Sequence, residues 1–400
     1  MKYFYTLFFL VLSHASFSQQ FAARGLVEDA VTHEPVIAAS VGIEKSGMGT
    51  ITNEEGIFQL SVSRSQTVII SCIGYKTYKM PASEFGEATK TIALEPSEEV
   101  LEEVMVTKIP LTQLLQEAII VSKARFNKPV VLHTYYREFV KVDGQYKKFS
   151  DALLDYHASG DAKKTKSELI VKQNRSFSLT PTNEDQDDQL SPTLNVQYGI
   201  FNSYSFEFLE KNILRDKNVK NYDLTLKSRK NTDGSEWFVI IIEPKTEIEK
   251  TLFEGAVIYD PKTKLIYDVD LHFADSHKQF PRTVSLLGLH VAVLDTRFKA
   301  VYKMTNNNYE LSYNNRFVKY KMWTKKFQEI SESRSDLIVT NFEKDDMTYN
   351  KKEVYKKKYL YNKPTHMNGK FWQKNNAIVL TAEEEKIIDA LEKAENATVK

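Results

Sequence analysis

The sequence predicts a mainly β protein, with an N-terminal seven-stranded β-sandwich and a larger antiparallel, half-barrel-like β domain that carries a few helices. The 400 residues include 21 Tyr and 23 Phe but only 14 Gly and 11 Pro, a balance that favours strands over disorder. Short alternating runs of apolar and polar residues, separated by turn signals, recur from residue 20 to residue 380. A chain of this length has room for two or three domains.

Residues 1–18 predict a secretory signal peptide. Lys2 gives a positive start, Phe4 to Leu12 form an apolar core, and Ser16 and Ser18 are the small residues before a cleavage site at Gln19. The apolar run is too short to span a bilayer comfortably, and no later run approaches that length. We therefore expect an exported chain with no transmembrane segment after signal removal.

Residues 20–97 predict the sandwich. Seven candidate strands are separated by turn clusters such as Asn53 to Gly56. Phe58, Leu60 and Val62 alternate with polar residues, as a half-buried strand requires. The expected strands are Ala23–Val27, Ala39–Ile43, Gly49–Thr52, Gly56–Val62, Thr67–Cys72, Tyr75–Met80 and Thr89–Leu94.

This module resembles the carboxypeptidase-regulatory-like domain, a transthyretin-like sandwich. The motifs that carry the resemblance are "G-x-V-x-D" from Gly25, "T-x-E-P-V" from Thr32, "G-T-x-T-N-x-x-G-x-F-x-L" from Gly49 and "S-x-I-G-Y" from Ser71. The resemblance implies an exported Bacteroidetes protein, in the periplasm or associated with the outer membrane, because such domains begin many proteins there, including TonB-dependent receptors. It implies no peptidase activity, since the zinc signature HxxE is absent.

Residues 98–128 predict a connector that ends in an amphipathic helix. Leu111, Leu114, Leu115, Ala118 and Ile119 share one face of the segment 110–126. We expect this helix to pack on the following domain. A helix that binds a partner is the alternative.

Residues 129–380 predict the antiparallel β domain, and residues 381–400 a C-terminal helix. Asp143-Gly144 is expected to turn a long hairpin, and Asp260 to Thr263 a second one. Thr381 and Glu384 have the spacing of a capping box. Phe371 and Trp372 are expected to anchor the last segment to the domain.

The larger domain resembles the half-barrel of periplasmic lipoprotein-carrier proteins in its pattern of strands and early helix. It is also similar to uncharacterised Bacteroidetes envelope proteins, through Ala118-Ile119, Tyr135 to Glu138 and Phe253 to Thr263. A periplasmic carrier of lipid or lipoprotein is therefore an alternative function. It requires an apolar cavity between the sheet and the helix 110–126.

One region of the sequence contains side chains that could support catalysis or metal binding. Asp268, Asp270 and His272 share a strand face and His277 follows in a turn, so a hydrolase or metal-dependent enzyme is a further alternative. A polar outer face explains the same alternation better. Cys72, the single cysteine, can form no internal disulfide and is expected to be a small core residue.

The sequence therefore favours a non-enzymatic envelope protein with a binding or scaffolding role. No residue is assigned as catalytic, cofactor-binding or metal-binding, and no cofactor is expected. The 54 basic and 53 acidic residues nearly cancel, so the overall charge predicts neither nucleic acid nor an anionic membrane as partner. The expected partner is an envelope protein or an apolar or saccharide ligand.

Overall fold

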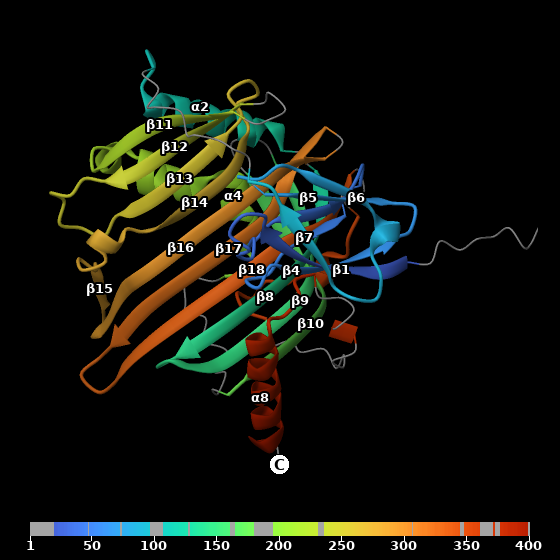
Figure 1. Ribbon diagram of the computed structural model, residues 1–400. Coiled ribbons are helices and arrows are strands. Elements are labelled where there is room, and N and C mark those ends of the chain that lie inside the picture. Colours follow the sequence, from blue (N-terminus) through green and yellow to red (C-terminus); the bar gives the residue numbers. More distant parts are fainter. Residues whose placement is uncertain are drawn as a thin grey trace, which may run out of the picture.

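Seven short strands form the N-terminal domain in the computed structural model (Figure 1). The structure describes residues 20–46, 48–72, 74–96, 107–126, 129–160, 165–179, 195–230, 236–305, 307–344, 348–360, 371–372 and 377–398. The strands are β1 (Gln20–Asp29), β2 (Ser40–Ile43), β3 (Gly49–Ile51), β4 (Ile57–Ser63), β5 (Thr67–Ser71), β6 (Tyr78–Pro81) and β7 (Lys90–Leu94), with the short helix η1 (Ala82–Glu84) before β7. They pair as two sheets, β4-β1-β7 and β3-β2-β5-β6, which confirms the predicted sandwich.

Sequence motifs of the sandwich act as turns and core, as predicted. Asn53 Oδ1 accepts hydrogen bonds from the backbone N–H groups of Glu55 and Ile57, 3.0 and 2.8 Å away. Gly56 has a φ of +74°, and a Cβ at this position would lie 2.5 Å from the carbonyl oxygen of Val27, so only glycine fits. Phe58 is fully buried in the core between the sheets.

The second domain is built on one eleven-stranded antiparallel sheet. Its strand order is β10-β9-β8-β18-β17-β16-β14-β13-β12-β11, and β15 pairs with β16. The strands are β8 (Val130–Val142), β9 (Gln145–Gly160), β10 (Thr165–Ser178), β11 (Tyr222–Lys230), β12 (Glu236–Pro244), β13 (Phe253–Tyr259), β14 (Ile266–Phe273), β15 (Thr283–Leu286), β16 (Leu289–Thr305), β17 (Asn308–Trp323) and β18 (Gln328–Lys344). The last long strand, β18, pairs with the first, β8. The first and last strands of this domain therefore lie side by side within the sheet and not at its edges.

The predicted hairpin turns are present. Asp143 and Gly144 join β8 to β9 with φ angles of +49° and +80°, the combination that a two-residue hairpin of matching twist needs. Asp260 Oδ1 accepts a hydrogen bond from the Lys262 N–H in the turn between β13 and β14.

One face of the large sheet, the helix face, is covered by helices (Figure 1). These are α2 (Leu111–Arg125), α4 (Tyr198–Ser205), α5 (Glu207–Leu209), the π-helical turn η2 (Glu210–Leu214) and α6 (Asp216–Val219). The turns η3 (Asp275–His277) and η4 (Lys351–Glu353) lie in connections. Leu115, Ala118 and Ile119 of α2 are buried in the main apolar core, so this helix packs on the sheet as predicted.

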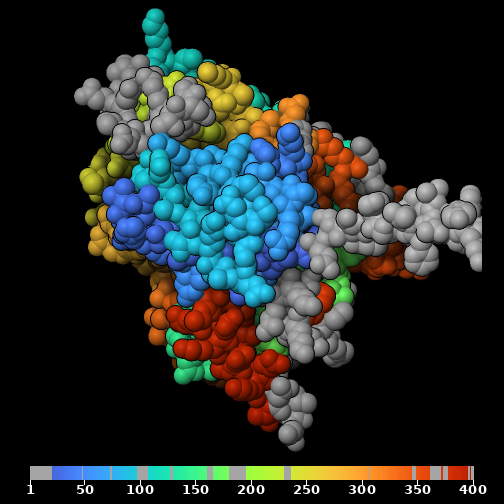
Figure 2. All heavy atoms as spheres, turned by 45° about the vertical axis from the view of Figure 1, so that its right-hand side comes forward, coloured from blue at the N-terminus to red at the C-terminus, as the bar shows by residue number. Residues whose placement is uncertain are grey.

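The opposite face, the sandwich face, carries the N-terminal domain and the C-terminal helix α8 (Ala382–Thr398). Figure 2 shows the sandwich seated over this side of the molecule with α8 directly beside it. Trp372 is buried against Tyr135, Tyr313 and Ile338 of the sheet, so it anchors the chain before α8 as expected. Among the described residues, no helix has both the length and the apolar composition needed to cross a bilayer.

Candidate functional site

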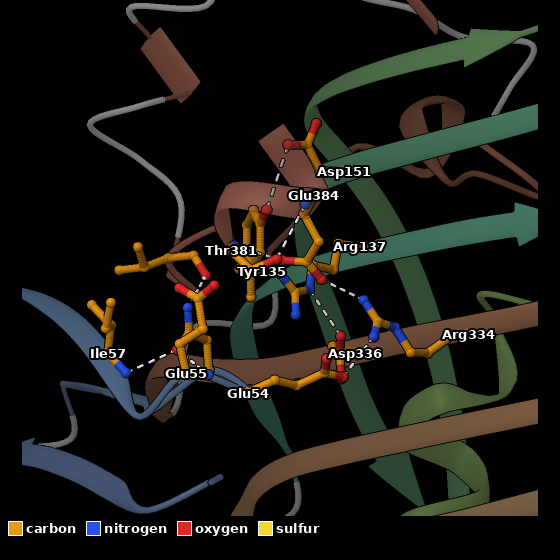
Figure 3. Close-up of polar contacts among 12 residues, drawn as sticks. Glu54, Glu55, Ile57, Tyr135, Arg137, Asp151, Arg334, Asp336, Thr381 and Glu384 are labelled. Atoms are coloured by element: carbon orange, nitrogen blue, oxygen red, sulfur yellow. Dashed lines mark hydrogen bonds and ion pairs between the residues drawn. The ribbon is translucent and has the colours of Figure 1, made fainter. Parts of the chain in front are cut away.

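A group of charged side chains, most of them buried, lies where the sandwich, the large sheet and the start of α8 meet. Alternation along β8 places Tyr135 and Arg137 on the sandwich face, whereas Tyr136 joins the core on the helix face. β18 supplies Arg334 and Asp336 to the same face, because the β8–β18 ladder places Asp336 opposite Arg137. Figure 3 shows these side chains converging on the start of α8.

Four side chains, Arg137, Arg334, Asp336 and Glu384, form what we call the interface cluster. Arg137 Nε donates to Asp336 Oδ2 over 2.8 Å, and Arg137 Nη1 donates to Glu384 Oε2 over 3.0 Å. Arg334 Nη2 donates to the other oxygen of Glu384. The side chains of Arg137 and Asp336 are 4% and 5% exposed, so this ion pair is shielded from solvent.

Asp336 accepts two hydrogen bonds besides the one from Arg137. Its Oδ1 atom accepts from the Tyr313 hydroxyl over 2.6 Å and from Asn315 Nδ2 over 2.8 Å. Burial by itself would raise the pKa of Asp336, but the positive charges of Arg137 and Arg334 outweigh it and lower the pKa. Asp336 is therefore a fixed negative charge on the sheet.

Glu384 joins the cluster to the C-terminal helix. Its Oε2 atom accepts from the Thr381 backbone N–H over 2.9 Å, and the Thr381 hydroxyl accepts from the Glu384 N–H over 3.1 Å. This reciprocal pair is the predicted capping box. The sequence did not indicate that the same carboxylate also binds two arginines of the sheet.

The sandwich reaches the cluster through its most recognisable motif, the segment Gly49 to Leu60. Glu54 Oε1 accepts from Arg334 Nη1 over 2.6 Å. Asn53 Nδ2 donates to the carbonyl of Val379 over 3.1 Å, and the Thr50 hydroxyl donates to the carbonyl of Ala377. The turn residues of the motif therefore also hold the segment that leads into α8.

A second buried pair lies beside the cluster. Asp151 on β9 is fully buried and accepts two hydrogen bonds from Arg175 on β10, 3.1 and 2.6 Å long. Burial raises the pKa of Asp151, and Arg175 only partly offsets this. The Arg175 guanidinium also lies over the Trp372 ring, 5.4 Å from its centre.

These contacts join the sheet to α8 and, through Glu54, to the sandwich. Glu384 and Asp336 are each paired with a guanidinium. Among the described residues, no three of His, Cys, Asp or Glu are grouped so that they could hold a metal ion.

The predicted pair His272 and His277 does not form a common site through its observed contacts. His272 Nε2 lies 3.1 Å from Glu254 Oε1 on the neighbouring strand. His277 is buried, and its ring contacts the Ser276 hydroxyl and the carbonyl of Lys245. The two rings have separate partners.

The polar face of β14 differs from the expected solvated surface. Asp270 forms two hydrogen bonds with Arg297 of β16, 3.2 and 2.7 Å long, and Lys299 Nζ lies 3.9 Å from Asp268. Burial raises the pKa of Asp268 to about 6, although Lys299 opposes the shift. A partly buried ionic ladder therefore replaces the open face, and Arg297 and Lys299 were missed because they lie some thirty residues away in sequence.

Cys72 follows β5, is half-buried and packs against the sandwich core, in line with a small core residue. Arg137 and Glu138 have different partners, as their alternation predicts, since Glu138 accepts from the Ser333 hydroxyl on the helix face. The predicted signal peptide and residues 98–106 of the connector lie outside the described residues.

The space beneath helix 110–126 is filled where the carrier alternative requires a cavity. The Phe126 ring stacks on Tyr309 with ring centres 4.7 Å apart and lies 4.0 Å from the ring centre of Tyr204. The Ser122 hydroxyl accepts a hydrogen bond from the Ile266 N–H, which joins α2 to β14. A groove of about 480 Å³ lies between α2 and the segment from α5 to Arg215. Its lining combines the apolar side chains of Ile119, Ile120 and Leu214 with five polar or charged ones.

Together, the two sheets of the sandwich and the eleven-stranded sheet define a mainly β protein. Its first domain is a CarboxypepD_reg-like domain, because residues 23–106 match the model of that family. The match extends past the predicted boundary at residue 97. The TonB-dependent receptor SusC of Bacteroides thetaiotaomicron is 37% identical over 97 residues, which cover 24% of this chain and 9% of the receptor. The chain therefore spans less than a tenth of the length of this relative.

Three solved structures are partly similar to this chain. A DUF1329 family protein from Desulfovibrio piger has 9% identity and a TM-score of 0.24, covering 60% of this chain and 93% of its own. Lipovitellin has 10% identity and a TM-score of 0.24, covering 56% and 26%. A LolA superfamily protein from Nitrosomonas europaea has 9% identity and a TM-score of 0.19, covering 60% and 97%.

Proposed function

We propose that the protein is a non-enzymatic, exported protein of the Bacteroidetes cell envelope that binds or scaffolds other envelope components. The observation that carries this proposal is the interface cluster, which joins the sandwich, the sheet and α8 through Glu54, Arg334, Glu384 and Arg137. We infer that the buried pairs of Arg137 hold α8 on the sheet in one arrangement, and that the exposed Glu54–Arg334 pair adds the sandwich to it. A fixed arrangement of these parts suits a scaffold.

The proposed location in the periplasm or at the outer membrane has two supports. Residues 23–106 match the CarboxypepD_reg-like family, and 97 residues of the chain are 37% identical to a TonB-dependent receptor of a Bacteroides species. The predicted signal peptide is the second support, since it would export the chain. The expected partner is an envelope protein or an apolar or saccharide ligand.

The contacts of the described residues support neither of the two rival functions. A carrier needs an open cavity beneath α2, where Leu115, Ile119 and Phe126 are instead packed into the core. A hydrolase at His272 and His277 needs the two rings to act on one substrate, whereas their contacts are separate.

Site-specific crosslinking in the native cell tests the proposal. A photoreactive residue is placed at Val31 or Ile37, two strongly exposed apolar positions in the loop between β1 and β2. A matched control carries it at Lys351, an exposed position of the larger domain in η4. We expect envelope-specific adducts from the sandwich positions that the control does not give. Recovery of the protein without adducts, entirely outside the envelope fraction, would contradict the proposal.

A further inference from the structure

Two neighbouring hairpins end in exposed apolar side chains at one end of the large sheet. β15 and β16 are joined by Leu287 and Gly288, and every residue from Pro281 to Gly288 is exposed. Leu287 is 100% exposed and Leu286 is 70% exposed. Figure 1 shows β15 at the end of the sheet that lies away from the sandwich.

The second hairpin joins β17 to β18 beside the first. The ladder pairs His290 of β16 with Trp323 of β17, so the turn at Thr324 to Phe327 is adjacent to the β15–β16 turn. Phe327 at this turn is 46% exposed. Exposed large apolar side chains therefore lie on two adjacent hairpin tips, and such gathering can mark a surface that meets another apolar phase.

The charged residues in the two turns are basic, and the nearest acidic residue along the chain is Glu329, two residues after Phe327. The segment 317–328 contains four lysines and no acidic residue, and the segment 279–294 contains Arg282 and no acidic residue. Lys319 pairs with Glu332, but Lys325 and Lys326 are exposed and have no ion-pair partner among the described residues. The balanced charge of the whole chain conceals this local excess.

We propose that these tips dock on a lipid bilayer that contains anionic lipid. We call Val284, Leu286, Leu287, Phe327, Lys325 and Lys326 the tip patch. Aliphatic and aromatic side chains gain free energy by entering the interface between headgroups and acyl chains, and lysines beside them gain from anionic headgroups. Charge complementarity therefore favours a bilayer over an uncharged protein surface.

The geometry suits insertion without refolding. Leu287 and Gly288 have φ angles of +50° and +84°, the positive values that a tight two-residue hairpin turn requires. This turn fixes the backbone at the tip of the β15–β16 hairpin. The Ser285 hydroxyl lies 2.7 Å from Nδ1 of His290, and the His290 ring stacks on Trp323, with ring centres 5.3 Å apart. These contacts hold the two hairpins together behind their exposed ends.

This inference deepens the proposed function, since it names the surface on which an envelope scaffold would be placed. The binding itself is independent of any protein partner, so it is measured with purified mature protein. The probes are phosphatidylcholine vesicles and vesicles in which part of that lipid is replaced by phosphatidylglycerol. Co-sedimentation or flotation gives the partition coefficient.

Two variants separate the apolar contribution from the charged one. Leu286→Ser combined with Leu287→Ser and Phe327→Ser should weaken binding to the mixed vesicles by at least about tenfold. Lys325→Gln combined with Lys326→Gln should weaken binding to the mixed vesicles by about tenfold and leave binding to phosphatidylcholine unchanged. Matched controls are Val31→Ser for the apolar change and Lys351→Gln with Lys352→Gln for the charge change, and both should bind like wild type.

All these side chains are exposed or partly exposed, so the variants should keep the wild-type circular dichroism spectrum and melting temperature. The inference is overturned if wild type does not bind the mixed vesicles, or if the tip variants bind as tightly as wild type. Self-association of wild type that the tip variants abolish, without vesicle binding, would also overturn it in favour of a contact between two copies. Envelope crosslinks from the sandwich combined with no vesicle binding would remove this inference and leave the proposed function standing.

Discussion

Arg137 and Glu384 are 247 residues apart in the sequence, and their side chains meet over a 3.0 Å hydrogen bond at the buried boundary between the sheet and the C-terminal helix. Arg137 also binds Asp336 of the neighbouring strand, and Glu384 also binds Arg334. Because Arg334 in turn binds Glu54 of the sandwich, a single chain of ion pairs spans all three parts of the molecule.

Removal of Arg137 should destabilise the protein strongly. Arg137→Met leaves the carboxylate of Asp336 buried without its closest cation, and we expect the free energy of unfolding to fall by about 3–5 kcal/mol. Urea denaturation measures the loss. The control Lys76→Gln removes an exposed pair with Glu95 and should cost at most about 1 kcal/mol. Equal losses of unfolding free energy in the two variants would show that the buried pair stabilises the protein no more than an exposed pair does.

The two contacts of Arg334 should differ in strength. Glu54 is 58% exposed, whereas Glu384 is 6% exposed. Double-mutant cycles with Arg334→Met should give a coupling energy of about 0.5 kcal/mol with Glu54→Gln and of at least about 1.5 kcal/mol with Glu384→Gln. A larger coupling to Glu54 would place the stronger link on the sandwich side and refute this ranking.

Asp268 should make the protein less stable as the pH rises from 4 to 7. Its folded pKa of about 6 lies above the ordinary value of 3.8, so in this range the folded state binds the proton that the unfolded state has lost. The stability that the protonated group contributes is therefore present below pH 4 and is lost as the pH rises through 6.

The variant Asp268→Asn removes this titration. Between pH 4 and pH 7, the difference in unfolding free energy between variant and wild type should change by about 2–3 kcal/mol in favour of the variant. Chemical denaturation at a series of pH values measures it. Parallel pH profiles for the two proteins would exclude an abnormal Asp268 in the folded state.

Ser122 should be needed to seat helix α2. Its hydroxyl accepts a hydrogen bond from the buried N–H of Ile266, and Ser122→Ala leaves that donor without this partner at a cost of about 1–3 kcal/mol. The control Gln116→Ala changes an exposed position of the same helix and should shift stability by less than about 0.5 kcal/mol. A melting temperature that both variants share with wild type would contradict the role of Ser122.

Local patterns allowed most of the fold to be predicted. The turn at Asp143-Gly144, the alternation around Phe58 and the apolar face of α2 each depend on residues that are close in sequence, and each is present. The capping box of Thr381 and Glu384 is local in the same sense.

The interface cluster could not be predicted, because its members come from three distant segments, β8, β18 and α8. Alternation placed Arg137 on the face of β8 opposite to Glu138, but nothing in the sequence identifies Asp336 or Glu384 as its partners. A residue that makes both a local and a distant contact could be predicted only in its local part. Asn53 fits a turn, as predicted, yet its second bond, to Val379, depends on how two domains pack.

The central claim is that the interface cluster joins sandwich, sheet and α8 into one body, and differential scanning calorimetry tests it most directly. For wild type we predict one cooperative transition whose calorimetric and van't Hoff enthalpies agree. For the combined variant Glu54→Gln, Arg334→Met and Glu384→Gln, we predict two separate transitions, because the domains then unfold independently. Two independent transitions in the wild-type protein, unchanged in the variant, would contradict the claim.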